Sequence, residues 1–554
     1  MAAPTLEIKT LGLGLRLSSK GASNRLTNRS LRILFTRASR CKTTSTMLRP
    51  RLSKDSSAWE SVIGLELHAQ IASKSKLFSA SKVQFMAPPN SLVSHFDAAL
   101  PGTLPVLNKR CVEAGVITAI ALSCHINKRS LFDRKHYFYA DLPSGYQITQ
   151  QRVPIATDGQ LTFTLFDEKR RHDPTRHRVR IKQIQLEQDS GKSLHDDVNH
   201  ETLVDLNRAG VGLMEIVTEP DLSSALEAAA MVRELQLILQ CIGTCDGRMD
   251  QGSLRVDANV SVNRPGDPPG VRAEIKNINS IRFVKNAIDF EIARQTELLE
   301  NGMEVSAETR SYDLKLGETV PMRDKEGKQD YRFMPEPNLP PLILYDNATI
   351  HTASDARSVV NIDEVRGRLP ELPEAKRQRL VKDYGIRLDS AVKLVNEDGL
   401  VNFFEAVISE DRERDPKKVV NWLETELLKS LNDHDLPVFK SPMDPTKLGE
   451  LHDLMTKGAI SANIGKKLMA EIFQGDSRPI TQIINEKGWA QITDRQELNQ
   501  LCEQVLKKDQ ALVDSYKSGN TRVINRLMGE VQKMTQGRAD PVITRDILTD
   551  KMTR

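Results

Sequence analysis

The sequence has few aromatic residues, few cysteines and no long apolar run, and each shortage excludes a class of protein. Phe, Trp and Tyr make up 5% of the 554 residues, and the six cysteines include no Cys-x-x-Cys pair, which argues against zinc-finger and dithiol redox proteins. The longest apolar stretches, such as 116–122, are far shorter than the ~20 residues that cross a bilayer. We therefore predict reduced thiols and no membrane association.

Familiar nucleotide-binding and hydrolase motifs are also missing. The sequence contains no Gly-x-x-x-x-Gly-Lys-Ser/Thr loop, no Gly-x-Ser-x-Gly elbow and no dinucleotide-binding fingerprint between a strand and a helix. The chain therefore offers no credible hydrolytic serine, and any use of ATP requires an unusual site.

Residues 1–54 differ in composition from the rest of the chain. They hold twelve of the 78 basic residues, one acid (Glu7) and many Ser and Thr, so 66 basic residues face 73 acids in the remainder. A basic, hydroxyl-rich start of this kind is typical of a mitochondrial transit peptide, which predicts a location in the mitochondrial matrix. A disordered basic arm that binds nucleic acid is the alternative.

The rest of the chain divides into three parts by its pattern. Residues 55–350 are mostly strand and turn, residues 351–440 are helical, and residues 441–554 form a helical tail after a proline-rich loop. The fold class predicted is α+β: a large mixed or antiparallel sheet forming a cradle, then a helical linker domain and an all-α C-terminal domain. Within the first part, helices are expected near 109–122, 223–241 and 281–299, the second with Asp221 or Ser223 as its N-cap.

Four predicted strands place polar side chains on one face. The polar alternating positions are Glu66, His68 and Gln70; Gln183, Gln185, Glu187 and Asp189; Ser253, Arg255, Asp257, Asn259 and Ser261; and Arg272, Glu274 and Lys276. A solvated sheet face is the ordinary explanation for any single strand. Rows of Gln, Asn, Asp, His and Arg favour instead a cradle that holds a charged ligand through fixed hydrogen bonds.

A cation site is one use of that face. Glu66, His68, Glu187 and Glu215 could meet around Mg²⁺ or Mn²⁺, which prefer oxygen ligands, while the imidazole leaves room for Zn²⁺. Cations for phosphate contacts are also present, at Lys135, Arg255 and Lys276.

The segment 204–221 fits neither a helix face nor an alternating strand and is interpreted as a site of chemistry. Asp205, Asn207 and Arg208 precede a glycine turn, and Glu215 and Glu219 then lie on one side of an extended chain. Glu219 stays unassigned because Pro220 follows it.

Six motifs together resemble the GatB family, the B subunits of the tRNA-dependent amidotransferases, in its mitochondrial form. The motifs are VIGLELH (62–68), RKHYFYADLP (134–143), DLNRAGVGLMEIVTEPD (205–221), GSLRVDANVS (252–261), EIKN (274–277) and DYRFMPEP (330–337). The resemblance extends from about residue 62 to residue 552 and includes KGAIS (457–461) in the tail.

The resemblance implies a function. Family members use ATP and Mg²⁺ to phosphorylate the γ-carboxylate of glutamyl-tRNA(Gln), and ammonia released by an amidase-type partner subunit then displaces the phosphate; a small third subunit completes the complex. It also implies that Glu66, His68, Glu187 and Glu215 hold the metal and that Lys135 lies on the substrate side, with Glu187, Glu215 and Lys135 catalytic. Asp189, Arg255, Asp257 and Lys276 are expected to line the ATP-binding cradle.

The chain departs from the family pattern at several positions. Ser144 and Gln188 stand where bacterial relatives have Lys and Glu, Gly212 replaces a proline, and residues 249–252 read MDQG instead of MEEG. These departures put the ammonia path in doubt more than the class of activity.

The C-terminal part carries a basic cluster that suits tRNA phosphates: Lys517, Arg522, Arg526, Lys533 and Arg538. A solvated helical face is the alternative. For the whole protein, two other functions stay open at this point: a non-catalytic scaffold that binds tRNA, and a free-standing ligase that activates a small carboxylic acid without tRNA.

Overall fold

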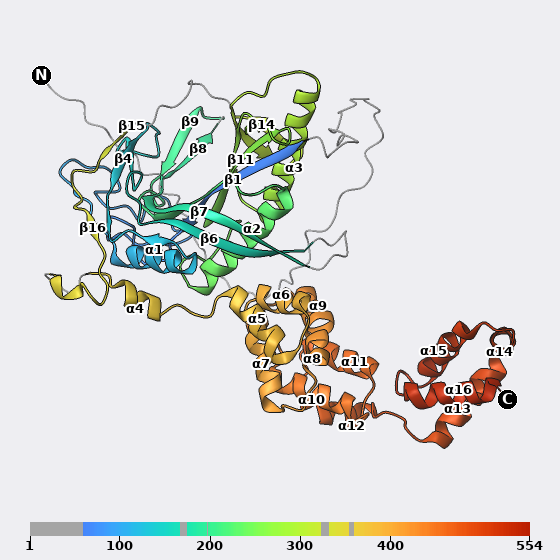
Figure 1. Cartoon of the computed structure of the whole chain (residues 1–554). Helices are drawn as coiled ribbons and strands as arrows, with labels where there is room; N and C mark the ends of the chain where they lie inside the picture. Colours follow the sequence, from blue (N-terminus) through green and yellow to red (C-terminus); the bar gives the residue numbers. More distant parts are fainter. Residues whose placement is uncertain (1–58, 167–173, 197, 323–331, 354–358, 554) are drawn as a thin grey trace, which may run out of the picture. The chain divides into compact units, whose positions relative to one another are not determined.

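The computed structural model describes residues 59–166, 174–196, 198–322, 332–353 and 359–553. The predicted transit peptide lies outside these ranges. In the described part a large sheet with three long helices comes first and a series of helices follows (Figure 1), which confirms the α+β class. No helix among these residues is long and apolar enough to span a membrane.

Nine strands form the main sheet. In spatial order they are β14 (Glu318–Pro321), β13 (Thr309–Asp313), β12 (Ala273–Ile278), β11 (Leu254–Asn263), β1 (Glu60–Gln70), β10 (Gly212–Thr218), β7 (Thr175–Gln188), β6 (Ala156–Leu165) and β2 (His125–Ile126). Neighbouring strands are antiparallel except for the parallel pair β12 and β13. The sheet is therefore mixed, with its polar central strands β11, β1, β10 and β7 side by side.

Smaller sheets flank the main one. Strands β15 (Arg332–Pro335), β4 (Asp133–His136) and β5 (Tyr146–Thr149) form a three-stranded sheet. Two further pairs are β16 (Leu342–Ile343) with β3 (Arg129–Ser130), and β8 (Lys192–Asp196) with β9 (Glu201–Asp205). The hairpin β4–β5 brings Lys135 toward the main sheet.

Alternation along the strands separates the two faces of the main sheet. In β1 the odd positions Ile63, Leu65, Leu67 and Ala69 are buried, whereas Glu66 and His68 between them are half-buried. The apolar face packs against helices α1 (Lys109–Ala121), α2 (Ala225–Cys241) and α3 (Ile281–Glu300) in one continuous hydrophobic core. Burying this face is the main stabilising term of the domain, and it leaves the polar face available for a ligand.

The start of α2 differs from the prediction. Ser224 is the N-cap, because its hydroxyl accepts the backbone N–H of Glu227 at 3.2 Å. The two expected caps are occupied elsewhere: Asp221 pairs with Arg180, and Ser223 bonds to the Glu227 carboxylate. Each has a charged partner that the local sequence pattern does not reveal.

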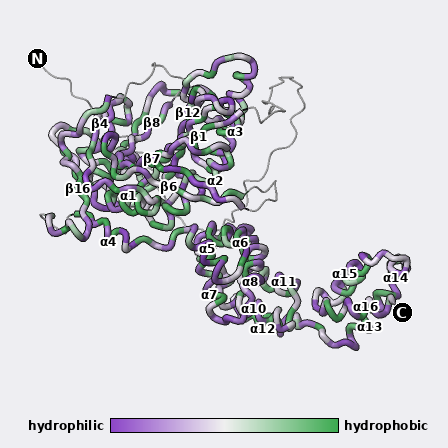
Figure 2. Tube along the Cα trace, in the orientation of Figure 1, coloured by the Kyte–Doolittle hydropathy of each residue, from purple (hydrophilic) through white to green (hydrophobic). Residues whose placement is uncertain are grey.

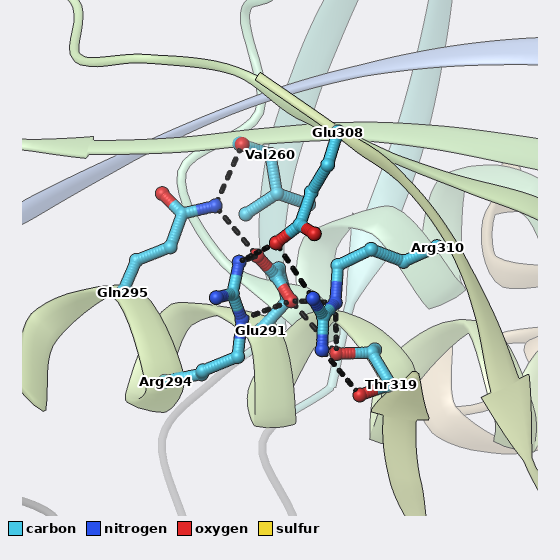
Figure 3. A network of polar contacts seen from close by, with 7 residues as sticks. All are labelled: Val260, Glu291, Arg294, Gln295, Glu308, Arg310 and Thr319. Atoms are coloured by element: carbon cyan, nitrogen blue, oxygen red, sulfur yellow. Dashed lines mark hydrogen bonds and ion pairs between the residues drawn. The ribbon is translucent and has the colours of Figure 1, made fainter. Parts of the chain in front are cut away.

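A buried polar network fastens the β13–β14 edge to α3 (Figure 3). The Glu291 carboxylate is fully buried and accepts hydrogen bonds from Arg294, Gln295 and Thr319, the last at 2.8 Å. Arg310 of β13 lies 3.4 Å from the same carboxylate. Because β13 pairs with β12, this network also fixes the strand that carries Lys276.

The helical part contains thirteen described α-helices. They are α4 (Ile362–Gly367), α5 (Pro373–Tyr384), α6 (Leu388–Asn396), α7 (Leu400–Glu410), α8 (Pro416–Trp422), α9 (Leu428–Asp433), α10 (Pro445–Thr456), α11 (Ala462–Phe473), α12 (Ile480–Lys487), α13 (Arg495–Lys508), α14 (Gln510–Lys517), α15 (Ile524–Met534) and α16 (Pro541–Thr553). Hydrophilic and hydrophobic stretches interleave along them (Figure 2), as amphipathic helices require.

The hydrophobic cores of this part do not divide at residue 440, where the sequence predicted a boundary. One core runs from Leu380 to Ile484 and includes Leu448 and Leu451 of α10, and a second begins at Leu498 and ends at Met552. Pro445 is the first residue of α10, a position that favours proline, so the proline-rich loop starts a helix within one core.

Candidate active site

The register of the main sheet brings the predicted polar residues onto one face. His68 lies directly opposite Glu215 on one side and Arg255 on the other, and Glu215 lies opposite Gln185. Side chains of directly opposed residues point the same way and lie within reach of one another. The polar residues that the alternation predicted therefore lie together on one face of the sheet, which we call the cradle.

Three of the four predicted metal ligands come together. One ligand atom from each of His68, Glu187 and Glu215 lies within 4.8 Å of the others, and His68 Nε2 is 3.5 Å from Glu187 Oε1. Two carboxylates and an imidazole nitrogen are donors that fit a divalent cation such as Mg²⁺ or Mn²⁺.

Glu66, the fourth predicted ligand, lies outside this group. It pairs with Val217 and Asp257, two residues along β1 from the His68–Glu215 pair, a step of ~6.6 Å along the strand. Its carboxylate accepts a hydrogen bond from the Asn259 amide at 3.0 Å. Burial, and then the charge of Glu215, raise the pKa of Glu66.

The electrostatics of the group favour a bound cation. Burial, and then repulsion from Glu215, raise the pKa of the Glu187 carboxyl well above its usual value, while the positive charge of Lys135 acts in the opposite direction. A divalent cation would compensate the negative charge of these two neighbouring carboxylates, one of which is buried. Lys135, half-buried on β4, is thus close enough to Glu187 to act on it.

Hydrogen bonds behind the group hold the carboxylates in place. The Gln185 amide donates to Glu215 and, at 3.2 Å, to the Thr149 hydroxyl, and that hydroxyl donates to Glu187 at 3.3 Å. The Gln183 side-chain amide in turn donates to Gln185 Oε1 at 2.7 Å. The sequence did not single out Thr149, because it comes from β5 in a separate sheet; the alternation of Gln147 and Thr149 facing β7 is the only local signal.

The remaining predicted cradle residues have different surroundings. Arg255 donates to the buried Asp189 carboxylate at 3.1 Å, while its buried Nε has no hydrogen-bond partner among the described residues. Lys276 is half-buried and lies 3.7 Å from Glu274. Asp257 accepts the backbone N–H of Asn277 at 2.8 Å, where the β11–β12 register shifts, so it supports the backbone at that shift.

The polar residues at 205–208 make hydrogen bonds that hold loops together. Asp205 and Asn207 bind the 88–92 loop through the backbone N–H groups of Asn90 and Leu92. Arg208 donates to the carbonyls of Ser190 and Gly191 at the end of β7. Arg208 also lies 3.5 Å from the Asp189 carboxylate, which Arg255 contacts, so both Arg208 and Glu215 connect this motif with the polar face.

A cavity of about 280 Å³ adjoins the cradle. It is lined by residues of four segments, among them Asp97, Ser144, Gln188, Asp189 and Gly210. Buried Asp97 Oδ1 and Gln188 Oε1 have no hydrogen-bond partner among the described residues. Two of the four departures from the family pattern, Ser144 and Gln188, thus line this cavity. A third, Gly212, begins β10 opposite Gln188.

The C-terminal basic residues lie in the second helical core region. Lys517 ends α14, Arg522 follows it, and Arg526 and Lys533 share one face of α15; all four are exposed. Arg538 differs, because it is half-buried and donates to the carbonyls of Thr535 and Gly488. Four of the five predicted cations are therefore placed where a polyanion could reach them.

The fold and the cradle together define a class: an α+β protein with a carboxylate–histidine centre on the polar face of a large mixed sheet. Comparison with family models refines this class. Residues 61–350 match the GatB/GatE catalytic domain, and residues 402–552 match the GatB domain.

Relatives of known name agree over most of the chain. The chain is 56% identical to the B subunit of the human mitochondrial glutamyl-tRNA(Gln) amidotransferase, covering 89% of each chain, and 54% identical to that of Danio rerio, covering 88% of each. It is 44% identical to the B subunit of the aspartyl/glutamyl-tRNA(Asn/Gln) amidotransferase of Wolbachia pipientis, covering 89% of this chain and 99% of the relative. The chain belongs to the GatB family of tRNA-dependent amidotransferase subunits.

Proposed function

We propose that this chain is the subunit of a mitochondrial tRNA-dependent amidotransferase that activates the γ-carboxylate of glutamyl-tRNA(Gln). Three animal relatives carry names that place them in mitochondrial enzymes for this tRNA. The single observation that carries the proposal is the convergence of His68, Glu187 and Glu215 on the polar face, inside the segment that matches the catalytic domain.

The reaction follows from the chemistry of a carboxylate. It is a poor acyl donor because it must expel oxide, so ATP transfers its γ-phosphoryl to a carboxylate oxygen and ADP departs. Ammonia then forms the C–N bond while the C–O bond to phosphate breaks, phosphate leaves with the electron pair, and a proton is lost. A divalent cation, which we propose to be Mg²⁺, would neutralise charge on the phosphates.

Residues of the cradle would position the reactants. His68, Glu187 and Glu215 would hold the cation, and Lys135 beside Glu187 would meet the negatively charged phosphoryl group or the substrate carboxylate. Arg255, fixed by Asp189 and with an unpartnered Nε, would provide a further donor for a phosphate oxygen. Lys276 would add a third positive side chain at the β12 side of the cradle.

Ammonia must come from elsewhere. We propose that an amidase-type partner releases it from glutamine and that a small third subunit joins the complex. The cavity beside Asp189 lies next to the site, and in this chain Ser144 and Gln188 give it a neutral lining at the two positions where bacterial relatives carry charges. The exposed cations of α14 and α15 would bind tRNA phosphates.

One substitution distinguishes a catalytic subunit from a non-catalytic scaffold that binds tRNA. Glu187→Gln keeps the size of the side chain but removes its charge, so the purified complex should form phosphorylated glutamyl-tRNA at least a hundredfold more slowly. A normal rate would favour the non-catalytic scaffold. ATP hydrolysis is measured with and without glutamyl-tRNA, because turnover that does not need the tRNA would indicate a free-standing ligase instead. Glu300→Gln, on the exposed end of α3, is the matched control.

A further inference from the structure

The tip of the β4–β5 hairpin lies beside the candidate active site. Lys135 is paired with Gln147 in the hairpin, and the Gln147 amide donates to the Gln188 carbonyl at 2.7 Å. Beyond the strands, the Gly191 N–H donates to the Asp141 carbonyl at 2.8 Å. The residues 137–145 are therefore fastened to the end of β7, next to Glu187.

Three consecutive aromatic residues, the aromatic tip, begin this turn: Tyr137, Phe138 and Tyr139. Phe138 is 87% exposed and Tyr139 is 53% exposed, although the chain has few aromatic residues and buries most apolar ones. The rings of Tyr137 and Tyr139 meet edge to face, with centroids 5.5 Å apart. Exposed aromatic rings that gather at one place are typical of a binding surface.

The backbone supports the exposed ring from one side. Gly145 has a φ of +71°, and a Cβ at this position would lie 3.0 Å from the Phe138 ring. The absence of a side chain at Gly145 thus lets the ring lie over the turn, and the high exposure of Phe138 leaves much of the ring open to solvent.

A cationic side chain accompanies the aromatic tip. Lys135 is two residues before Tyr137, and its Nζ lies 6.0 Å from the centre of the Tyr137 ring. Exposed rings next to cations are the combination that binds unpaired nucleotides: bases stack on the rings and phosphates approach the cations. A surface that docks only protein is expected to be depleted of lysine at its centre.

We propose that the aromatic tip stacks on the unpaired bases at the 3′ end of the tRNA whose aminoacyl group enters the cradle. This inference rests on the proposed function. The open position of Phe138 favours the strand end over the adenine of ATP, because small nucleotides are enclosed in concave pockets whereas unpaired strands use exposed stacking surfaces.

The test uses the complete complex and compares two Michaelis constants. Phe138→Ala should raise the KM for glutamyl-tRNA on the order of tenfold and leave the KM for ATP unchanged, whereas Phe138→Trp should keep the wild-type KM for the tRNA. Phe439→Ala removes an aromatic ring that is 74% exposed in the helical part, and it should change neither constant. Thermal unfolding checks that the variants remain folded.

Several outcomes would overturn the inference. An unchanged KM for the tRNA in Phe138→Ala, or an equal rise in Phe439→Ala, would remove the stacking role. A rise in the KM for ATP alone would assign the tip to the adenine of ATP, and failure of the Phe138→Ala complex to assemble would assign it to a protein partner. These results are distinct from failure of the proposed function, in which the wild-type complex itself would lack ATP turnover dependent on glutamyl-tRNA.

Discussion

Replacing Gly210 by alanine should destabilise the cradle domain far more than the same change at another left-handed glycine. Gly210 has a φ of +83°, and a Cβ there would lie 2.7 Å from Asp97 Oδ1. That carboxylate cannot turn away freely, because its other oxygen accepts hydrogen bonds from the Lys76 ammonium at 3.0 Å and from the Ser94 N–H at 2.9 Å. Both side chains of the Lys76–Asp97 pair are fully buried.

The expected magnitude has two parts. Alanine in the left-handed region costs ~1 kcal/mol or somewhat more. Displacing Asp97 weakens a buried ion pair, and breaking such a pair outright costs ~3–5 kcal/mol. Gly243 provides the control, because it has a φ of +65° with nothing within 4 Å of the added Cβ. We therefore expect Gly210→Ala to exceed Gly243→Ala by about 2–4 kcal/mol in the free energy of unfolding.

The purified chain is unfolded with a chemical denaturant. Unfolding is monitored with a probe confined to the cradle domain, such as hydrogen exchange of the β1 and β10 amides. Equal destabilisation by the two alanines would refute the reasoning, since it would mean that Asp97 moves aside at no cost. In an Asp97→Ala background the difference between the two glycine sites should disappear, and its persistence would also contradict the explanation.

Three other predictions concern the site, the sheet edge and the tail. Gln185→Leu removes the donor shared by Glu215 and Thr149, so the Mg²⁺ concentration for half-maximal activity should rise about 10- to 100-fold; an unchanged Mg²⁺ requirement would argue against this positioning role. Glu291→Gln removes the negative charge of a fully buried carboxylate that pairs with Arg294 and Arg310. The free energy of unfolding of the cradle domain should fall by ~3–5 kcal/mol, and an unchanged free energy of unfolding would contradict this prediction. Arg526→Ala should weaken tRNA binding and reduce its salt dependence by about one phosphate contact, whereas Arg538→Ala should not, because Arg538 already bonds to backbone carbonyls. Curves of tRNA binding at several salt concentrations distinguish the effects of Arg526→Ala and Arg538→Ala.

Much of the fold and part of the site followed from local patterns. The period-two alternation of β1 predicted a polar face with Glu66 and His68, and the helical period predicted α1 and α3 almost to the residue. Both patterns report whether a side chain is buried, and burial depends on the repeat of the backbone. The family resemblance came from short motifs in order, and the comparisons confirm it.

The tertiary structure decided which residues act together. Alternation assigns a face but does not give the register between strands, so Glu66 and His68 were indistinguishable in sequence, and only the pairing of β1 with β10 places His68 with Glu215 and leaves Glu66 beside Asn259. Thr149 joins the group from another sheet, and the polar residues at 205–208 fasten loops, because their hydrogen-bond partners are distant in sequence. The sequence by itself determined the α+β class and the polar face, since those depend on local periodicity, and it indicated the family through short motifs in a fixed order. The grouping of His68, Glu187 and Glu215, and the aromatic tip beside it, depend on long-range strand pairing that only the folded chain supplies.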